Sequence, residues 1–474
     1  MDIFYAVRFT SVLFALLQVS VSVHILMHKE DEKSAIAWIG LVWLAPILGS
    51  IFYIIFGINR IRRKALALRN NHPDIRKITG QTPQQFLATL PPPLFELLTL
   101  GYKVHPQYFS FGNRIIPFLN GDNAYPQMCR LIASAQKEVL LQSYIFANDT
   151  AGKMFLEALK TAVQNGASVK VLTDGVGVNY TKPNILCELK KIHGLEYAVF
   201  LPAKRPVSFP FVNLRNHRKI LVVDGETAFF GGMNIAAGNL QLAHPKKPIT
   251  DITFQVSGPV VGQMVRTFEQ DWLFAGKGDF FPFLPTEKET FSKTPARIIP
   301  DGPDGDYGKI ERLLLGILSC AQREISIVTP YFLLEKEMRC ALETAVRRGV
   351  KIEVILPQKS NIFGMDLAMQ AAIVPLLQAG VQIYRSRPPF DHSKICVADG
   401  EWVFIGSANW DARSLKLNFE CNMECLDKKL AASLQKIIHA KKRNSLKVSV
   451  TEWNALPFWH KLAGRAACLL TPYY

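Results

Sequence analysis

A short motif, His-x-Lys followed after four residues by Asp, occurs in two copies in this chain. Each copy continues after six more residues into Gly-Gly or Gly-Ser, one further residue, and Asn. The copies consist of His217, Lys219, Asp224 and Asn234, and of His392, Lys394, Asp399 and Asn409. One His-x-Lys arises by chance, whereas a paired set at identical offsets indicates an internal repeat. The repeat predicts two similar halves whose half-sites meet at one active centre.

The segments around the motifs repeat as well. In each half, a strand that closes on Tyr and Phe precedes an amphipathic helix, a glycine at the C-cap position and a β-branched strand. These segments are 135–146, 152–165 and 168–172 in the first half, and 321–332, 335–348 and 350–356 in the second. The alternation predicts the α/β class, with two pseudo-symmetric domains built on mostly parallel sheets. We expect the domains to span residues 106–290 and 291–445.

Composition limits the partners. The chain has 474 residues, of which 49% are hydrophobic, so it can bury two large cores. Its net charge of +16 indicates a polyanionic partner, either nucleic acid or an anionic membrane, and the charge alone does not choose between them. The 8 cysteines include no Cys-x-x-Cys pair, which argues for reduced thiols and against zinc.

The N-terminus has the pattern of a membrane anchor. Residues 9–27 and 35–58 contain no Asp, Glu, Lys or Arg, and each segment approaches the ~20 residues needed to cross the hydrocarbon core. They predict a transmembrane helical hairpin over residues 1–64, since membrane helices tolerate the Pro46 that interrupts the second span. A cleaved signal peptide is the alternative for the first span, but the apolar run is longer than such a segment needs. Basic residues between Arg60 and Arg69 place everything after the hairpin in the cytoplasm.

Two further segments flank the predicted domains. Residues 65–105 are predicted to be a linker with helical stretches, broken at a run of three prolines from Pro91. The C-terminal segment, 446–474, contains an apolar helical face formed by Trp459, Leu462, Ala466, Leu469 and Leu470. This face predicts either an interfacial membrane helix or a terminal helix docked on the second domain.

The motif combines side chains that suit a phosphate. If each motif begins a strand, His and Lys project from one face, whereas the Asp has an odd offset from the His and faces the other way. A lysine neutralises non-bridging oxygens, and an asparagine donates hydrogen bonds to them. One histidine can attack phosphorus while the other protonates the leaving alcohol. The alternative is that each His-x-Lys only begins a strand, with the imidazole capping backbone groups.

These residues resemble the phospholipase D superfamily, whose signature is H-x-K-x4-D-x6-G-[GS]-x-N in two copies. The resemblance extends from Tyr108 to about Asp427. The N-terminal residues Trp38 and Pro46–Gly49, with Phe268–Trp272 and Arg413-Ser414, resemble bacterial cardiolipin synthases in particular. The family implies the catalytic set His217, Lys219, Asp224, His392, Lys394 and Asp399, with Asn234 and Asn409 as substrate-binding residues. It also implies that Asp251 and Glu420 orient the histidines, with His217 as the nucleophile and His392 as the acid and base.

The resemblance further implies transfer of a phosphatidyl group through a phosphohistidine, without a metal or other cofactor. The expected reaction joins two phosphatidylglycerols into cardiolipin and releases glycerol, in a multi-pass protein of the bacterial inner membrane. The expected partners are therefore anionic phospholipid and the bilayer, rather than nucleic acid. Alternatives are a phospholipase D that uses water or another alcohol, a nuclease, and a scaffold with inactive motifs. Departures from the family at 238–248, Ile249-Thr250 and Asp391 leave the second substrate open.

Overall fold

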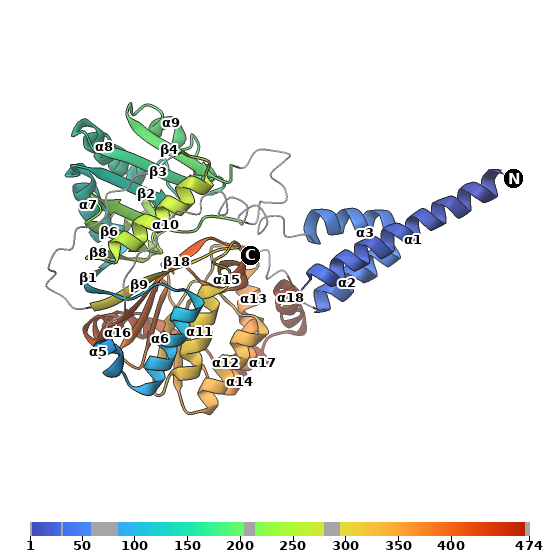
Figure 1. The fold of residues 1–474 in the computed structure, drawn as a ribbon. Coiled ribbons are helices and arrows are strands. Elements are labelled where there is room, and N and C mark those ends of the chain that lie inside the picture. Colours follow the sequence, from blue (N-terminus) through green and yellow to red (C-terminus); the bar gives the residue numbers. More distant parts are fainter. Residues whose placement is uncertain (1, 30–31, 58–83, 203–213, 279–293, 470–474) are drawn as a thin grey trace.

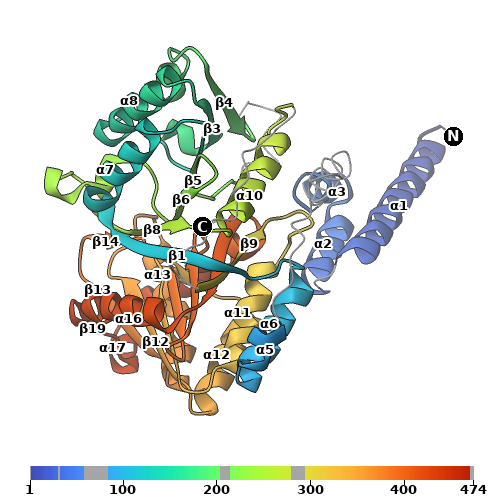
Figure 2. The ribbon, with the colours of Figure 1, turned by 60° about the vertical axis from the view of Figure 1, so that its left-hand side comes forward.

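One 15-stranded sheet runs through both halves of the chain, in the order β19-β13-β12-β10-β15-β16-β18-β9-β1-β8-β6-β5-β2-β3-β4. The computed structural model describes residues 2–29, 32–57, 84–202, 214–278 and 294–469 (Figure 1). The halves join where β1 pairs antiparallel with β9, and Figure 2 shows β1 lying between them. The strand order on one side of this junction repeats on the other, as the duplicated motif predicts for two similar halves.

The strands of the first half are β1 (Ser110–Leu119), β2 (Glu138–Ser143), β3 (Ser168–Asp174), β4 (Leu195–Phe200), β5 (Ile220–Val223), β6 (Thr227–Gly231) and β8 (Ile252–Ser257). Those of the second half are β9 (Thr294–Asp301), β10 (Glu324–Val328), β12 (Lys351–Pro357), β13 (Gln382–Ser386), β15 (Ile395–Ala398), β16 (Trp402–Gly406), β18 (Glu420–Leu426) and β19 (Ser445–Lys447). Two short pairs lie outside the main sheet, β7 (Ile249–Thr250) with β14 (Phe390–Asp391), and β11 (Phe332–Leu333) with β17 (Trp410–Asp411).

The prediction of mostly parallel sheets is wrong, because the sheet is mixed. Only β2, β3 and β4 in one half, and β10, β12 and β13 in the other, pair in parallel. Each motif strand is instead joined to its successor by a tight hairpin, which forces antiparallel pairing. The hairpins turn at Asp224-Gly225 and Asp399-Gly400, where all four residues have positive φ. Asp-Gly is a known signal for such turns.

Helices cover both halves, and side chains of the helices and the sheet together form three buried cores. In the first half, α7 (Asn120–Ala133), α8 (Thr150–Gln164) and α10 (Val261–Phe274) are the main helices; in the second they are α11 (Lys309–Cys320), α12 (Lys336–Arg347) and α16 (Lys428–Arg443). Shorter helices of the second half include α13 (Met365–Ala372), α14 (Val374–Ala379), α15 (Ala412–Lys416), α17 (Val450–Asn454) and α18 (Phe458–Cys468). One core belongs to each half. The third joins residues of both halves, including Phe254 and Trp272 with Met423 and Leu434, and so ties the halves together.

Part of the predicted linker belongs to the second half. Within it, α6 (Pro92–Val104) begins with proline at its first turn, and packs along α11 (Figure 1). Leu97 is fully buried in the core of the second half. Gly316 permits this close packing, because a Cβ atom there would lie 2.6 Å from Leu100 Cδ2. The rest of the linker also contains α5 (Gln84–Ala88), whereas residues 65–83 lie outside the described part of the chain.

The N-terminal segment differs from the predicted pair of spanning helices. Helix α1 (Asp2–His28) is continuous, and within the described residues it alone is long and apolar enough to cross a membrane. The second predicted span divides into α2 (Glu32–Leu44) and α3 (Pro46–Phe52), followed by a π-helical turn from Tyr53 to Gly57. The break lies at Ala45, whose φ of −140° and ψ of 80° are not helical, since a residue before proline avoids the α conformation.

Helix α3 folds back along α2 and does not extend it. A Cβ atom at Gly49 would lie 2.5 Å from the carbonyl oxygen of Leu41. Further along, the rings of Trp38 and Tyr53 are 5.6 Å apart. Both contacts join residues on opposite sides of the break at Ala45, so α2 and α3 run antiparallel, and α1 lies beside them (Figure 1).

The packing of α6 predicts a specific stability difference. Replacing buried Leu97 with alanine should lower the free energy of unfolding by about 2–5 kcal/mol, because it leaves a cavity in the core of the second half. Replacing exposed Phe95 on the same helix should change it by about 0.5 kcal/mol or less. Denaturant unfolding of the full-length variants in detergent measures both. Equal, small effects would show that α6 is only a linker.

Candidate active site

The two motif histidines face each other at the junction of the halves. Their ring centroids are 6.4 Å apart, and the ring planes are inclined by 80°. The expectation that each motif begins a strand at its histidine is wrong, because β5 and β15 begin at Ile220 and Ile395, just after the motif lysines. His217 therefore lies in the segment that leads into β5, and His392 lies between β14 and β15. Both are buried, and both line one cavity of about 880 Å³. The repeat thus places two half-sites against a single chamber.

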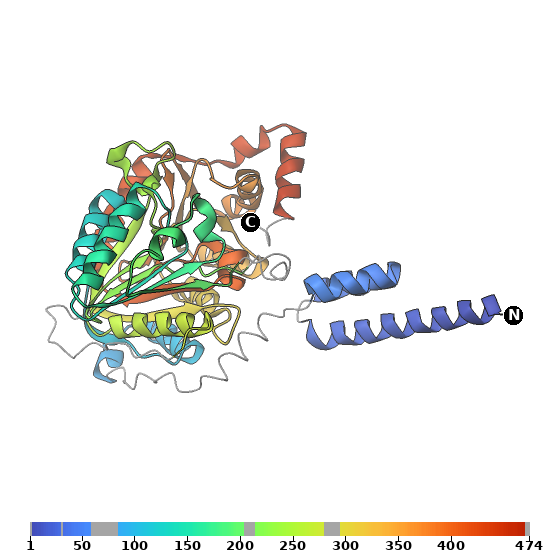
Figure 3. The same cartoon turned by 90° about the horizontal axis from the view of Figure 1, so that it is seen from above.

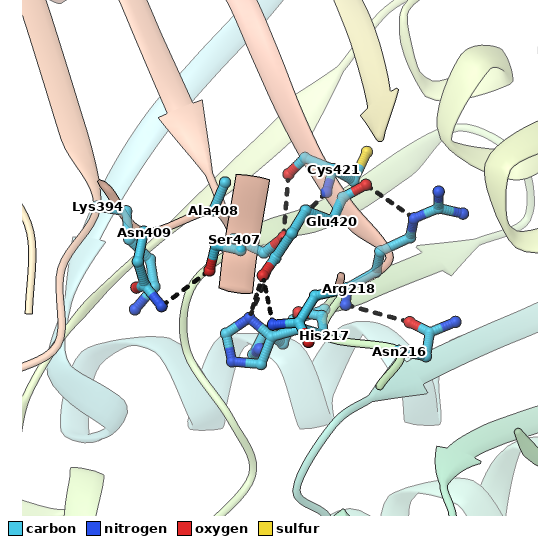
Figure 4. A network of polar contacts seen from close by, with 12 residues as sticks. Asn216, His217, Arg218, Lys394, Ser407, Ala408, Asn409, Glu420 and Cys421 are labelled. Atoms are coloured by element: carbon cyan, nitrogen blue, oxygen red, sulfur yellow. Dashed lines mark hydrogen bonds and ion pairs between the residues drawn. The ribbon is translucent and has the colours of Figure 1, made fainter. Parts of the chain in front are cut away.

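Each imidazole is hydrogen-bonded to a carboxylate from the other half. Nδ1 of His217 lies 3.0 Å from a carboxylate oxygen of Glu420, at the start of β18 (Figure 4). Nδ1 of His392 lies 2.8 Å from Oδ2 of Asp251, which directly precedes β8. Because Nδ1 is occupied in both rings, Nε2 is the nitrogen of each that remains to react.

The backbone repeats this exchange between the halves. The amide of His217 donates to the carbonyl of Phe419 at 2.8 Å, and the amide of His392 donates to the carbonyl of Thr250 at 2.7 Å. Phe419 and Thr250 are the residues just before the two carboxylates. Main chain and side chain therefore fix each imidazole to the same short segment of the opposite half.

Further contacts hold the Glu420 carboxylate in place. Ser407 Oγ donates to it at 2.5 Å (Figure 4), and Asn418 Nδ2 donates at 3.1 Å. Burial alone would raise the pKa of Glu420, but His217 and Lys219 outweigh burial and lower it. The carboxylate is therefore ionised at neutral pH, and it orients the ring and stabilises a positive charge on it.

Burial sets the protonation of both imidazoles. It lowers the pKa of His217 to about 4, although Glu420 acts in the opposite direction. Burial and the neighbouring Lys394 also lower the pKa of His392, against the effect of Asp251. A lowered pKa means that the ring is neutral at pH 7, so each Nε2 carries the lone pair that a nucleophile or a base needs.

The motif lysines lie beside the histidines. Lys219 Nζ donates to the carbonyl of His217 at 2.6 Å, and Lys394 Nζ donates to that of His392 at 2.5 Å. Burial lowers the pKa of Lys219 well below its usual value, and lowers that of Lys394 to about 8. A bound phosphate would raise both pKa values again, because its negative charge favours the ammonium form.

A glycine of the first half makes room for a lysine of the second. A Cβ atom at Gly232 would lie 2.8 Å from Lys394 Cδ. The corresponding position of the second motif is Ser407, which bonds to Glu420. The difference between Gly-Gly in one copy and Gly-Ser in the other therefore reflects different neighbours at the junction.

The two motif aspartates lie away from the cavity. Asp224 accepts hydrogen bonds from the backbone amides of 136–138, and Asp399 accepts them from those of 322–324. Each therefore ties the hairpin after a motif strand to the beginning of β2 or β10. The family resemblance grouped these residues with the catalytic set, whereas the strand pattern predicted that they face away from the histidines. They do face away, but because each lies in the turn after β5 or β15 and not because of strand alternation.

Both predicted asparagines line the cavity. Oδ1 of Asn234 accepts from the Ile145 amide at 3.1 Å, which points the amide group in a fixed direction. Nδ2 of Asn409 donates to Ser414 Oγ at 3.1 Å. The loop after β2 therefore fixes Asn234, and helix α15 fixes Asn409, in the lining of the cavity that the histidines share.

The residues on either side of each histidine are anchored to the last long helix of their own half. Asp271 on α10 binds Asn216 at 2.8 Å and Arg218 at 2.7 Å. In the second half the charges are reversed, since Lys441 on α16 binds Asp391 at 2.6 Å and Ser393 at 3.2 Å. The sequence did not reveal these anchors, because they are far from the motifs along the chain.

The unusual Asp391 therefore has a structural explanation. Burial would raise its pKa, but the ion pair with Lys441 outweighs burial and lowers it. Asp391 does not line the cavity, whereas Phe390 and Ile249 from the same short strand pair do. We expected the departures from the family pattern at 238–248, Ile249-Thr250 and Asp391 to bear on the identity of the second substrate. For Asp391 this expectation is wrong.

Paired His-Lys motifs on one mixed sheet, facing a common cavity, define a two-domain protein of the phospholipase D type. The family model described as "Cardiolipin synthase, PLD-like domain" matches residues 128–272 and 314–441, and the model "Phospholipase_D-nuclease N-terminal" matches 16–57. The chain belongs to the cardiolipin synthase family, whose members are phosphatidyltransferases of the phospholipase D superfamily.

Curated relatives extend this similarity over nearly the whole chain. Cardiolipin synthase 1 of Bacillus cereus is 30% identical over 465 residues, covering 94% of this chain and 90% of the relative. The major cardiolipin synthase of Bacillus subtilis is 27% identical over 478 residues, covering 97% and 98%. Among solved structures, the phosphatidylserine synthase of Haemophilus influenzae has the same fold, with a TM-score of 0.63 at 14% identity, covering 80% of this chain and 100% of that one.

The ion pair between Asp391 and Lys441, next to His392, predicts a pH-dependent change in stability. Replacing Lys441 with methionine leaves the Asp391 carboxylate buried and unpaired, which costs about 3–5 kcal/mol at neutral pH. Because the native pKa of Asp391 is lowered by the pair, its contribution is present at neutral pH and is lost as pH falls through that pKa. The difference in melting temperature between wild type and Lys441→Met should therefore narrow on acidification.

The control is Lys428→Met on the same helix. Lys428 is exposed and lies 3.7 Å from Glu401, so its loss should cost about 0–1 kcal/mol at any pH. Thermal unfolding of the three proteins across a pH series gives the comparison. A penalty for Lys441→Met that stays constant with pH would contradict the proposed anchor.

Proposed function

We propose that this enzyme joins two phosphatidylglycerol molecules into cardiolipin and releases glycerol, with a phosphohistidine at His217 as intermediate. The observation that carries the proposal is the pair of facing imidazoles, each hydrogen-bonded to a carboxylate of the other half. One imidazole can serve as nucleophile while its neighbour transfers protons to and from alcohols. The names of the relatives support this choice of lipid.

In the first step, Nε2 of His217 attacks the phosphorus of one phosphatidylglycerol. A P–N bond forms, the P–O bond to glycerol breaks, and the leaving oxygen takes a proton from the His392 imidazolium. The substrate's negative charge favours that protonated form as it approaches, with Asp251 stabilising it. Lys219 and Lys394 face the non-bridging oxygens, whose charge they neutralise.

In the second step, neutral His392 removes the proton from a glycerol hydroxyl of a second phosphatidylglycerol. That oxygen attacks phosphorus, the P–N bond breaks, and both histidines return to their starting forms. Donor and acceptor each carry a phosphate, and the cavity is lined by Lys247, Lys359 and Arg413 in addition to the motif histidines and asparagines. These cations suit a product with two negative charges.

The product profile tests this function. In mixed micelles of labelled phosphatidylglycerol, with and without phosphatidylethanolamine, we expect cardiolipin and free glycerol by chromatography and mass spectrometry. Phosphatidic acid alone would mean that water is the acceptor. Release of ethanolamine in the presence of phosphatidylethanolamine would identify a different phosphatidyl donor, whereas no lipid turnover would contradict the proposal and direct the search to nucleic acid.

The roles of the two histidines predict different trapping behaviour. A phosphatidyl ester of p-nitrophenol has a leaving group that needs no proton, so His392→Ala should still release nitrophenolate in a burst. It should then stall as a covalent adduct, because no base activates the acceptor. His217→Ala should show neither burst nor adduct. Intact-protein mass spectrometry distinguishes the two, and an adduct on His217→Ala instead would reverse the assignment.

We infer that α1 anchors the enzyme in the bacterial plasma membrane, with the catalytic halves on the cytoplasmic side. The 13 residues of α2 extend for about 20 Å, less than the ~30 Å of the hydrocarbon core. Since α3 returns along α2, the chain leaves this unit on the side where it entered. The anchor then crosses the membrane once, in place of the predicted double crossing. Lys29 and Lys33 follow or begin the helices at that side, and the sequence continues after α3 into basic residues at 60–64, a pattern that the positive-inside rule assigns to the cytoplasmic side.

This topology places the N-terminus outside the cell. Cysteine introduced at Asp2 should react with a membrane-impermeant maleimide on intact cells, because α1 separates it from the catalytic body. Cysteine at Lys153 on α8 should react only after the cells are opened. In a double crossing, both positions would lie inside, so protection of position 2 in intact cells would contradict the single crossing.

A further inference from the structure

The C-terminal helix α18 carries its large apolar side chains on its outer face. Phe458 and Trp459 are 68% and 74% exposed, and Leu462 and Leu469 are 45% and 80% exposed. The buried residues of this helix are only glycine and alanine, Gly464 and Ala467. A helix on the surface of a soluble domain shows the opposite arrangement, with its large apolar residues turned toward the core.

Small residues hold α18 firmly on the second half. A Cβ atom at Gly464 would lie 2.9 Å from the carbonyl oxygen of Leu367 on α13. His460 Nε2 and Gln370 Oε1, 2.9 Å apart, join the same two helices. The two alternatives drawn from the sequence are therefore compatible, because one face docks and leaves the other exposed. Leu470, at the end of the predicted face, lies outside the described residues.

The exposed face lies next to the mouth of the active-site cavity. In the turn before α13, the helix under α18, Phe363 is 99% exposed. The two residues before it, Asn361 and Ile362, line the cavity. Figures 1 and 3 place α18 on the side of the body that is turned toward the N-terminal helices. Anchor, apolar face and cavity mouth thus lie toward one side of the molecule.

We propose that Phe363, Phe458, Trp459, Leu462 and Leu469 form a membrane-docking surface that enters the head-group region of an anionic phospholipid bilayer. Aromatic side chains favour this zone, and a fixed helix can insert them without losing further conformational freedom. Lys461 and Arg465 lie on the same helix, and the net charge of +16 favours an anionic surface. The bilayer, and not a second copy of the chain, is the occupant that also meets the anchor and the cavity. Docking brings the cavity mouth to the depth from which a phospholipid head group enters.

The direct test measures insertion without relying on turnover. Trp459→Cys carries an environment-sensitive fluorophore, in full-length protein whose exposed Cys187 and Cys340 are replaced by serine. In proteoliposomes containing phosphatidylglycerol, lipids brominated near the head group should quench this label. The same label at Met154 on α8, at the far side of the body in Figure 1, should not be quenched. Absence of quenching at position 459 would overturn the proposal, and so would disulfide crosslinking between two copies through that position.

A second experiment asks whether docking serves the active site. The triple variant Phe458→Ser, Trp459→Ser, Leu462→Ser should process vesicle phosphatidylglycerol about tenfold more slowly, because it loses apolar contact with the bilayer. Its turnover of monomeric short-chain phosphatidylglycerol should match that of wild type, which also establishes that it is folded. Equal loss with both substrates would overturn the docking role. Failure of the proposed synthase reaction would appear in wild type as well, and would leave the quenching result unaffected.

Discussion

The site depends on hydrogen bonds that cross between the halves of the chain. Glu420 of the second half holds His217 of the first, and Asp251 of the first half holds His392 of the second. Each half therefore contributes one imidazole, together with the carboxylate that binds the imidazole of the opposite half. Neither half alone has a complete site. Burial strengthens both bonds, because the surrounding dielectric is low and water does not compete.

The fold holds the two halves in the relative position that these hydrogen bonds require. The pairing of β1 with β9 makes one sheet of the two halves, and residues of both fill the third core. Buried Arg218 adds to the junction, since it donates to the carbonyls of Glu420 and Asp301 while paired with Asp271. A shift of one half against the other would lengthen both imidazole–carboxylate hydrogen bonds together.

Strand alternation does not place the site residues, because β5 and β15 begin at Ile220 and Ile395, after the motif lysines. The duplicated motif nevertheless predicted two half-sites at one centre, where His217 and His392 face each other. It could not reveal which half supplies each carboxylate, since spacing along a chain contains no information on the partner across a junction. The antiparallel strands were missed although Asp-Gly marks both hairpins. The second apolar span was misread because hydropathy measures apolar length, whereas one non-helical residue before Pro46 reverses the chain direction.

Nuclear magnetic resonance of the full-length protein, labelled with ¹⁵N-histidine, tests the exchange most directly. The chain has 10 histidines, and the variants His217→Gln and His392→Gln assign the two signals. The account predicts that Glu420→Gln changes the tautomer and pKa of His217 alone, and that Asp251→Asn changes those of His392 alone. If each carboxylate instead governed the histidine of its own half, or neither histidine responded, the junction would not be the active centre.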